Sequence, residues 1–306
     1  MLKKPLTGVL PVAPAVFHEN GSLDLEGQAR VMDLMVDQGS DAICILANFS
    51  EQFVMTDEER RLSTEACLKQ VNGRTPAIVT CSHFSTQIAS ARAKHAADHG
   101  AAMLMLMPPY HGAALQADEA MMIEHFAAVA KASGLPIMVQ DAPLSGVKLS
   151  VPFLVRLAQE VPLVSYFKIE VASAAQKLRD LIAAGGKSIV GPFDGEESIT
   201  LMADLDAGAK GSMCSAMIPD LIKPVITAHH GGERAKAAAL YKNILPLINY
   251  ENRQCGLRSA KAVMMAGGVI KSDHVRHPLR PLHPETRKGL LELAHEANPL
   301  ALHWGK

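Results

Sequence analysis

The chain has 306 residues, of which 48% are hydrophobic, 20% charged and only 4% aromatic, so it can bury a large aliphatic core. Its 30 basic and 31 acidic side chains give a formal net charge of −1, which argues against a nucleic-acid partner or an anionic membrane surface. The five cysteines are odd in number and form no CxxC pair, which predicts free thiols in a reducing compartment rather than a disulfide framework or zinc site. With no signal pattern and no apolar run of about 18 residues, we expect a soluble, cytoplasmic protein.

Short apolar runs recur along the chain, and each is followed by a longer stretch with helical periodicity. The runs are apolar on both faces, which is typical of strands buried in a parallel sheet. The predicted strands are residues 8–17, 42–47, 77–82, 102–107, 136–141, 164–169, 188–191 and 211–215. The predicted helices are residues 25–38, 57–71, 85–99, 117–133, 151–160, 174–184, 196–207 and 219–230.

Eight strand–helix units favour a closed (β/α)8 TIM barrel, and the lack of a GxGxxG motif after the first strand disfavours an open doubly wound sheet. Three further helices are predicted at residues 234–250, 254–266 and 284–297. We therefore expect a catalytic barrel over residues 1–230 and, packed on it, a C-terminal helical extension over residues 231–306.

Active sites of such barrels lie at the carboxyl ends of the strands, which directs attention to Lys168 in the sixth strand. The surrounding sequence, Val-Ser-Tyr-Phe-Lys-Ile-Glu-Val, is otherwise mostly apolar. A buried lysine is costly to charge, and its neutral amine is the nucleophile that Schiff-base chemistry needs. The alternative is a structural lysine that reaches solvent or pairs with Glu170.

Other polar residues stand at predicted strand ends. Glu170 has the same side-chain parity as Lys168, so the two could exchange protons around an imine or simply form an ion pair. Asn48 and Ser50 follow the second strand in a turn that could hold a carboxylate or merely cap a helix. The histidines show no metal-ligand spacing, so no metal site is predicted; His83 and His111 are candidates for polar contacts at the top of the barrel.

With these residues in place, the chain resembles the dihydrodipicolinate synthase / N-acetylneuraminate lyase family over residues 5–300 or so. The family's Gly-Thr-Thr-Gly-Glu loop falls on Ala47-Asn48-Phe49-Ser50-Glu51, and its Tyr-Asn-x-Pro segment on Gln140-Asp141-Ala142-Pro143. Its imine lysine falls on Lys168, and its Gly-x-Asp segment near residues 191–194. The resemblance implies Schiff-base chemistry at Lys168.

Residues that differ from the family pattern indicate which substrate and reaction to expect. Gln140 replaces the catalytic tyrosine, and an amide can orient a partner but cannot relay a proton as a phenol does. Asn48 replaces the first loop threonine, and no arginine follows Pro143, which argues against the synthase reaction itself. Together with Lys-Ile-Glu in place of Lys-Glu, these departures resemble the L-2-keto-3-deoxyarabonate dehydratase branch.

That branch implies a hydro-lyase of pentose catabolism that acts on a small 2-keto acid and needs no metal or organic cofactor. We expect Lys168 to form the imine, Glu170 to act as acid or base, and Gln140 to orient substrate or water. Predicted substrate-binding residues are Asn48, Phe49, Ser50, Tyr110, Gly191 and Met213. The resemblance also implies a homotetramer built as a dimer of dimers. An aldolase that releases pyruvate and a non-catalytic 2-keto acid binding protein are the alternatives.

Overall fold

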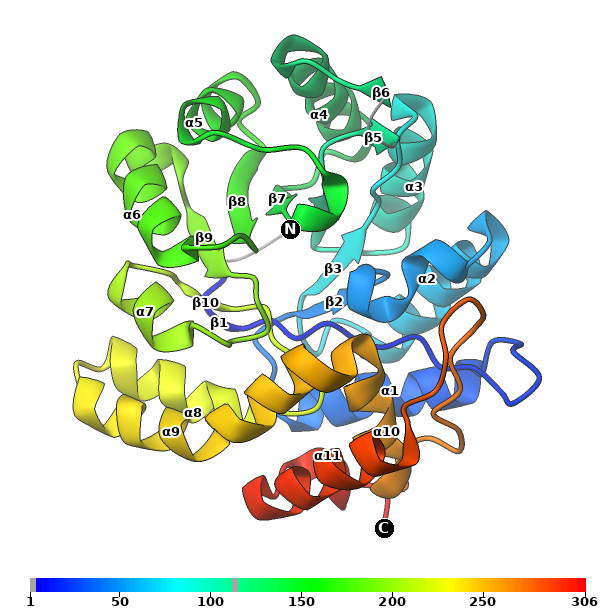
Figure 1. Cartoon of the computed structure of the whole chain (residues 1–306). Helices are drawn as coiled ribbons and strands as arrows, with labels where there is room; N and C mark the ends of the chain where they lie inside the picture. The colour runs from blue at the N-terminus through cyan, green and yellow to red at the C-terminus, as the bar shows by residue number, and fades with distance from the viewer. Residues whose placement is uncertain (1–3, 112–114) are drawn as a thin grey trace. The chain divides into compact units, whose positions relative to one another are not determined.

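The computed structural model describes residues 4–111 and 115–306. Over these residues, eight parallel strands alternate with helices (Figure 1). The strands are β1 (Gly8–Val9), β2 (Ile43–Ile45), β3 (Ala77–Thr80), β4 (Met103–Leu106), β7 (Ile137–Asp141), β8 (Val164–Ile169), β9 (Gly191–Asp194) and β10 (Gly211–Ser212). This alternation is the (β/α)8 barrel that the sequence predicts.

The helices lie close to their predicted positions, apart from those expected at residues 196–207 and 254–266, which each begin five residues later. They are α1 (Leu25–Asp37), α2 (Asp57–Val71), α3 (Thr86–Asp98), α4 (Glu119–Ser133), α5 (Val151–Glu160), α6 (Ala174–Gly185), α7 (Leu201–Asp206), α8 (Pro219–His230), α9 (Arg234–Tyr250), α10 (Ser259–Ala266) and α11 (Pro284–Ala297). None of the described helices is long and apolar enough to cross a membrane.

Contacts divide the chain into two compact units. The first unit comprises residues 1–7, 76–196 and 200–213, and the second comprises residues 8–75, 197–199 and 214–306. The predicted boundary between residues 230 and 231 falls inside the second unit, and the proposed division into barrel and extension stays a prediction.

In the first unit, β3, β4, β7, β8, β9 and β10 are parallel neighbours in chain order. Helices α3 to α6 lie outside these strands (Figure 1). Because both faces of each strand are covered, the strands are apolar throughout: Met103 to Leu106 are all completely buried. A polar side chain on such a strand therefore needs a specific partner.

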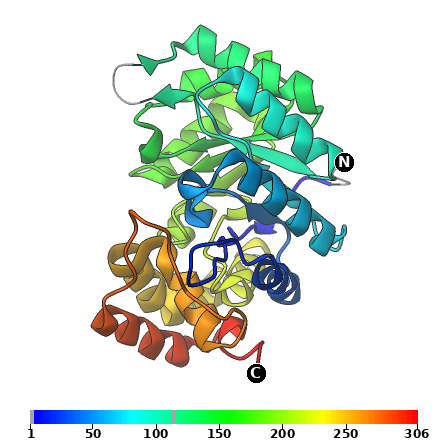
Figure 2. The ribbon, with the colours of Figure 1, turned by 90° about the vertical axis from the view of Figure 1, so that its right-hand side faces the viewer.

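In the second unit, Val12 forms parallel bridges to both Cys44 and Ser215, which joins the first, second and eighth strand segments. Helix α9 packs against α8 and α11, and α10 packs against α11. In Figure 2, α9, α10 and α11 are coloured from yellow to red and lie close together. The C-terminal helices thus share a compact unit with the segments around β1 and β2.

Helix starts follow the capping rules that the sequence displays. The Thr56 hydroxyl accepts a hydrogen bond from the Glu59 N–H, and the Glu59 carboxylate accepts one from the Thr56 N–H, which completes a capping box. Ser150 caps α5, with Pro152 in the first turn where its missing N–H costs nothing. Helix α4 ends at Gly134, whose φ of +67° favours glycine.

Some local predictions are wrong, among them those for the seventh strand and for α7. The seventh strand was expected at residues 188–191 but is Gly191–Asp194, because it continues through Pro192. Pro192 has no N–H to donate, yet its carbonyl accepts a hydrogen bond from Lys210 N at 2.7 Å. Helix α7 was expected at residues 196–207 but begins at Leu201, because Glu197 and Ser198 take φ values of +48° and +72°.

The first predicted strand, residues 8–17, is regular only at Gly8–Val9 and otherwise forms single bridges at Val12 and Phe17. Pro11 and Pro14 interrupt its row of donors. A short antiparallel hairpin, β5 (Tyr110–His111) with β6 (Leu115–Gln116), was not predicted. All five cysteines are free and buried, as expected from their number and spacing.

Candidate active site

The core of the site lies in the first unit, on one row of its sheet. Gln140 on β7 is in register with Lys168 on β8, and Lys168 is in register with Phe193 on β9. Side chains in register on parallel strands point to the same face of a sheet. The next row, which contains Asp141 and Asp194, therefore points to the opposite face.

Lys168 and Gln140 share one carboxylate. The Lys168 Nζ lies 3.2 Å from Glu170 Oε2, and the Gln140 Nε2 donates a hydrogen bond to the same oxygen at 2.8 Å. The Lys168 side chain is only 2% exposed, while Glu170 is 17% exposed and lies just past the end of the strand. An amine, a carboxylate and an amide thus converge at the carboxyl end of β8, as the shared parity of Lys168 and Glu170 predicts.

The orientation of the Gln140 amide follows from this contact. A carboxylate only accepts hydrogen bonds, so the NH₂ group must face Glu170 and the carbonyl must point away. Gln140 is completely buried, and among the described residues its Oε1 has no hydrogen-bond partner. The site therefore presents one buried acceptor in the same row as the lysine.

Carboxyl groups on the opposite face anchor the strands to the outer helices. Asp141 pairs with Lys177 of α6 at 2.6 Å, and Lys177 also donates to the Leu149 carbonyl. Burial raises the pKa of Asp141, although the hydrogen bond from Lys177 opposes the shift. These contacts fix the end of β7, which carries Gln140.

Asp194 makes a similar anchor for β9. It accepts hydrogen bonds from Ser212 Oγ on β10 and from Glu196 N at 3.1 Å. Burial and the nearby carboxylate of Asp204 raise the pKa of Asp194, because a second charge is costly inside the protein. The residues next to Asp194 are thereby held in place beside Lys168.

Gly195 is a functional candidate that the sequence reasoning missed. A Cβ at this position would lie 2.8 Å from Lys168 Cγ and 2.8 Å from the Ile169 carbonyl oxygen. Both distances are shorter than real Cβ contacts allow, so only glycine fits. The backbone at Gly195 thus packs directly against the stem of the lysine.

Replacing Gly195 by alanine should displace Lys168. We expect a stability loss of about 1–3 kcal/mol from overpacking and a roughly tenfold slower imine formation from misplacement of the amine. Thermal unfolding and the rate of borohydride trapping with pyruvate measure the two effects. Gly185→Ala is the matched control, because its Cβ would crowd Ile189 instead; that variant should lose stability but keep the trapping rate. Equal trapping rates in both variants would contradict the assignment.

The remaining predicted residues of the first unit lie in different surroundings. Gly191 starts β9 in register with Tyr166, whose ring fills the space where a side chain would stand. Met213 is completely buried and its N–H bonds to the Asp194 carbonyl at 2.9 Å.

Tyr110 lies on the β5–β6 hairpin, where burial raises its pKa. The His83 Nδ1 accepts a hydrogen bond from Ser85 N at 2.9 Å, near the start of α3; the His111 side chain lies outside the described part of the chain.

The predicted carboxylate loop belongs to the second unit and forms a 3₁₀ turn, η1 (Asn48–Ser50). The Ser50 hydroxyl donates to the Ala13 carbonyl at 2.6 Å and accepts from Ala47 N at 3.0 Å. Because a hydroxyl has a single proton, the Ser50 side chain is used to hold the turn. The Asn48 Oδ1 accepts a hydrogen bond from Gln52 Nε2 at 2.7 Å.

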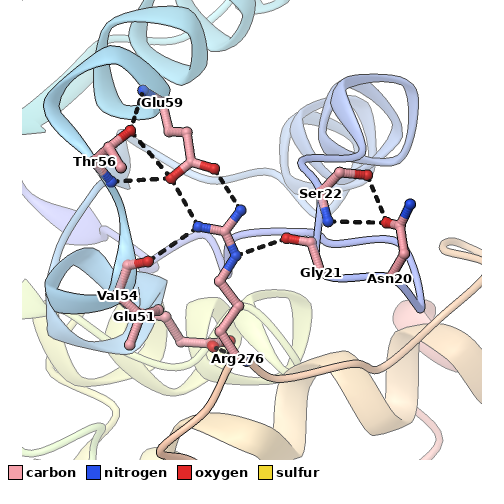
Figure 3. A network of polar contacts seen from close by, with 8 residues as sticks. All are labelled: Asn20, Gly21, Ser22, Glu51, Val54, Thr56, Glu59 and Arg276. Carbon is pink, nitrogen blue, oxygen red and sulfur yellow. Dashed lines mark hydrogen bonds and ion pairs between the residues drawn. The ribbon is translucent and has the colours of Figure 1, made fainter.

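A network of charges lies next to this turn (Figure 3). The guanidinium of Arg276 donates to Glu59 at 2.7 Å, to the Val54 carbonyl at 3.0 Å and to the Gly21 carbonyl at 2.7 Å. It also lies over the Phe17 ring, 4.3 Å from its centroid. The segment that includes Arg276 therefore holds the start of α2 and the end of the preceding turn.

The Glu59–Arg276 pair should make stability depend on acid pH. Hydrogen bonds from Arg276 lower the pKa of Glu59 from 4.5 to about 2. A depressed folded-state pKa contributes stability above about pH 4.5, and that stability is lost as the pH falls toward 2. We expect Glu59→Gln to lose at most about 3 kcal/mol of unfolding free energy at pH 7, with the difference from wild type shrinking below pH 4.5.

Urea unfolding at several pH values measures this difference. Glu58→Gln is the control, because Glu58 is 68% exposed and only pairs with Arg61 at 3.6 Å. A Glu59→Gln deficit that stays constant from pH 7 down to pH 3 would contradict the linkage.

Comparisons with known proteins agree with this architecture. The sequence matches the Dihydrodipicolinate synthetase family over residues 5–297. It is 54% identical to an L-2-keto-3-deoxyarabonate dehydratase from Azospirillum brasilense, over 97% of this chain and 96% of that one. It is 30% identical to 4-hydroxy-tetrahydrodipicolinate synthase 1 from Streptomyces coelicolor, over 92% of each chain.

Among solved structures, a dihydrodipicolinate synthetase-like protein from Pseudomonas aeruginosa superposes with a TM-score of 0.88 at 30% identity, covering 95% of this chain and 99% of that one. The dihydrodipicolinate synthase from Aquifex aeolicus, at 24% identity and a TM-score of 0.87, covers 96% of this chain and 98% of that one and shares the fold. The match to the family spans all eight strands and the C-terminal helices as far as residue 297. The chain therefore belongs to the dihydrodipicolinate synthetase family.

Proposed function

We propose that the protein is a Schiff-base hydro-lyase that converts L-2-keto-3-deoxyarabonate into α-ketoglutarate semialdehyde. The dehydratase relative, at 54% identity over nearly the whole chain, supports this substrate. The observation that carries the mechanism is the carboxylate of Glu170, which contacts both the Lys168 amine and the Gln140 amide. This arrangement brings together a nucleophile, an acid or base and an orienting group at the carboxyl end of β8.

The reaction begins at the C2 ketone of the substrate. The neutral amine of Lys168 attacks C2, and Glu170, 3.2 Å away, takes a proton from the amine and returns one to the departing water. Loss of this water gives the iminium. Its positive charge acidifies the C3–H bond, and removal of a C3 proton by Glu170, directly or through a water, gives the enamine.

Elimination follows from the enamine. The electron pair forms the C3–C4 double bond, and the C4 hydroxyl takes a proton and leaves as water. A proton is then lost from C5 and one is added at C3, after which the C5 enol becomes the aldehyde. Hydrolysis of the imine consumes one water and frees Lys168, so the net change is the loss of one water.

The C1 carboxylate needs a separate binding group. We assign it to Asn48, Phe49 and Ser50, the residues on which the carboxylate-binding loop of the family falls. Tyr110 and Met213 are proposed to contact the part of the substrate beyond the C1 carboxylate. Gly191 is the weakest member of the predicted set, because the Tyr166 ring packs on it.

Product analysis with L- and D-2-keto-3-deoxypentonates tests the proposal. The dehydratase releases α-ketoglutarate semialdehyde without cleaving a carbon–carbon bond. An aldolase working through the same enamine would release pyruvate and glycolaldehyde, so pyruvate as the main product would exclude the dehydratase. A protein that binds 2-keto acids without converting them would give neither product.

We also infer a role in pentose catabolism in the cytoplasm and a homotetrameric assembly of two dimers. The substrate in the name of the dehydratase relative supports pentose catabolism. The cytoplasmic location and the tetramer are expectations from the sequence and from the family resemblance. Light scattering coupled to gel filtration measures the assembly: a mass close to four times 32.7 kDa is expected, and a monomer at working concentration would rule it out.

A further inference from the structure

Two buried carboxyl groups of the first unit have no role in the reaction described above. Asp194 at the end of β9 and Asp204 of α7 are both completely buried. Asp194 accepts hydrogen bonds from the Ser212 hydroxyl and from Glu196 N. Asp204 accepts a hydrogen bond from the Thr200 hydroxyl at 2.6 Å. Each carboxyl group is therefore held in place by its own donors.

The side chains of Asp194 and Asp204 are also hydrogen-bonded to each other. An ionised carboxyl group only accepts hydrogen bonds, so two carboxylates could not form this contact. One of the two groups must carry a proton. The hydrogen bond from Asp194 lowers the pKa of Asp204, whereas burial and the charge of Asp204 raise the pKa of Asp194. Asp194 is therefore the donor of the shared proton.

Charged groups of neighbouring elements face this pair. Glu196, just after β9, opposes ionisation of Asp204, whereas Arg179 of α6 favours it. Lys168 of β8 favours the ionised form of Asp194 and so lowers its pKa. Burial outweighs these attractions and raises the pKa of both aspartates. The pair thus keeps its proton at a pH at which an exposed aspartate is ionised.

The end of β9 brings the pair close to Lys168. Asp194 is in register with Ile169, the residue after Lys168. The next residue, Gly195, donates a hydrogen bond to the Ile169 carbonyl at 3.0 Å, and its backbone packs against the Lys168 stem. Interactions between two titrating groups are reciprocal, so the ionised form of Asp194 must in turn favour the charged form of Lys168. Because Lys168 and Asp194 are both buried, solvent screens this interaction little.

We propose that Asp194 and Asp204 share one proton and that the charge of this pair determines how much of Lys168 is present as the neutral amine. The inference rests on the proposed function, in which that neutral amine attacks the substrate ketone. Loss of the shared proton adds a second negative charge to the pair, which favours the ammonium form of Lys168 and slows imine formation. Both aspartates act through Lys168 and are positioning residues.

The pH dependence of imine formation tests the inference. Pyruvate at subsaturating concentration, with cyanoborohydride as a reductant that survives mildly acid solution, gives the trapping rate at Lys168 as a function of pH. We expect Asp194→Asn and Asp204→Asn each to lower the midpoint of this curve by roughly one pH unit, because each removes one negative charge near the amine. The double variant removes both charges and should lower the midpoint further.

Asp180→Asn is the matched control. Asp180 lies at an exposed position of α6, where it accepts a hydrogen bond from Gln176 at 2.9 Å. Solvent and salt screen its charge, so we expect its removal to move the midpoint by less than about 0.2 pH unit. Circular dichroism at each pH establishes that a variant is folded, and Asp204→Asn decides the matter if Asp194→Asn does not fold.

The outcomes separate this inference from the proposed function. A slower trapping rate with an unmoved midpoint in a folded variant would mean that the pair has only a structural role, and it would overturn the inference alone. A midpoint that rises would do the same. Failure of the wild-type protein to trap pyruvate at Lys168 would overturn the proposed function itself.

Discussion

Lys168→Ala should abolish turnover, with kcat/KM falling by about four orders of magnitude or more. No other group in the row of Lys168 can form an imine, because Gln140 is an amide and Phe193 is a hydrocarbon. The variant should also gain no mass when pyruvate and borohydride are added. Mass spectrometry of the intact protein and a direct assay for α-ketoglutarate semialdehyde measure the two effects.

Lys148→Ala is the matched control for this experiment. Lys148 lies in the loop after β7 and its side chain is exposed, so its removal should leave both trapping and turnover intact. Full turnover in Lys168→Ala would end the Schiff-base assignment. A mass gain at another lysine in wild type would move the assignment to that residue.

Glu170→Gln should slow the proton transfers of imine formation and elimination while leaving the Lys168 amine in place. The amide oxygen of glutamine can still accept the hydrogen bond from Gln140, so the geometry is kept while proton transfer is lost. Loss of a positioned acid or base costs about 10²- to 10⁴-fold in rate. We therefore expect kcat to fall within that range, while pyruvate is still trapped at Lys168 by borohydride.

Exchange of the C3 protons of pyruvate with deuterated water gives a second measurement on the same variant. Wild type should catalyse this exchange through the enamine, and Glu170→Gln should catalyse it much more slowly. Glu160→Gln, at an exposed position of α5 where Glu160 pairs with Arg156 at 2.6 Å, is the control. Normal exchange together with slow turnover in Glu170→Gln would assign the C3 proton to a different base and leave Glu170 a role only in later steps.

The sequence predicts the barrel well because its signals are local and repeated. Apolar runs, glycine ends and capping residues such as Thr56 and Ser150 each act within a few positions. The contact of Lys168 with Glu170 was also predictable, because the two residues lie on one strand with the same parity. The link from Gln140 to Glu170 required only that β7 and β8 be neighbours.

Other features depend on contacts that no local pattern reveals. The Tyr241 hydroxyl donates to the carbonyls of Ser198 and Ile199, which supports the left-handed residues before α7 and explains why that helix begins late. No local pattern predicts the buried ion pair of Glu51, because its partner Lys261 lies 210 positions away. The sequence predicts β9 three residues too early, and the strand continues through Pro192, which has no N–H to donate.

The Gln140 carbonyl has a consequence for discrimination among substrates. An unpartnered buried acceptor costs about 1–3 kcal/mol, and a ligand that donates a hydroxyl proton to it recovers much of that cost. A 2-keto acid without such a hydroxyl leaves the acceptor unsatisfied. If the proposed function holds, pyruvate should therefore form the imine and still compete only weakly with a hydroxylated sugar acid.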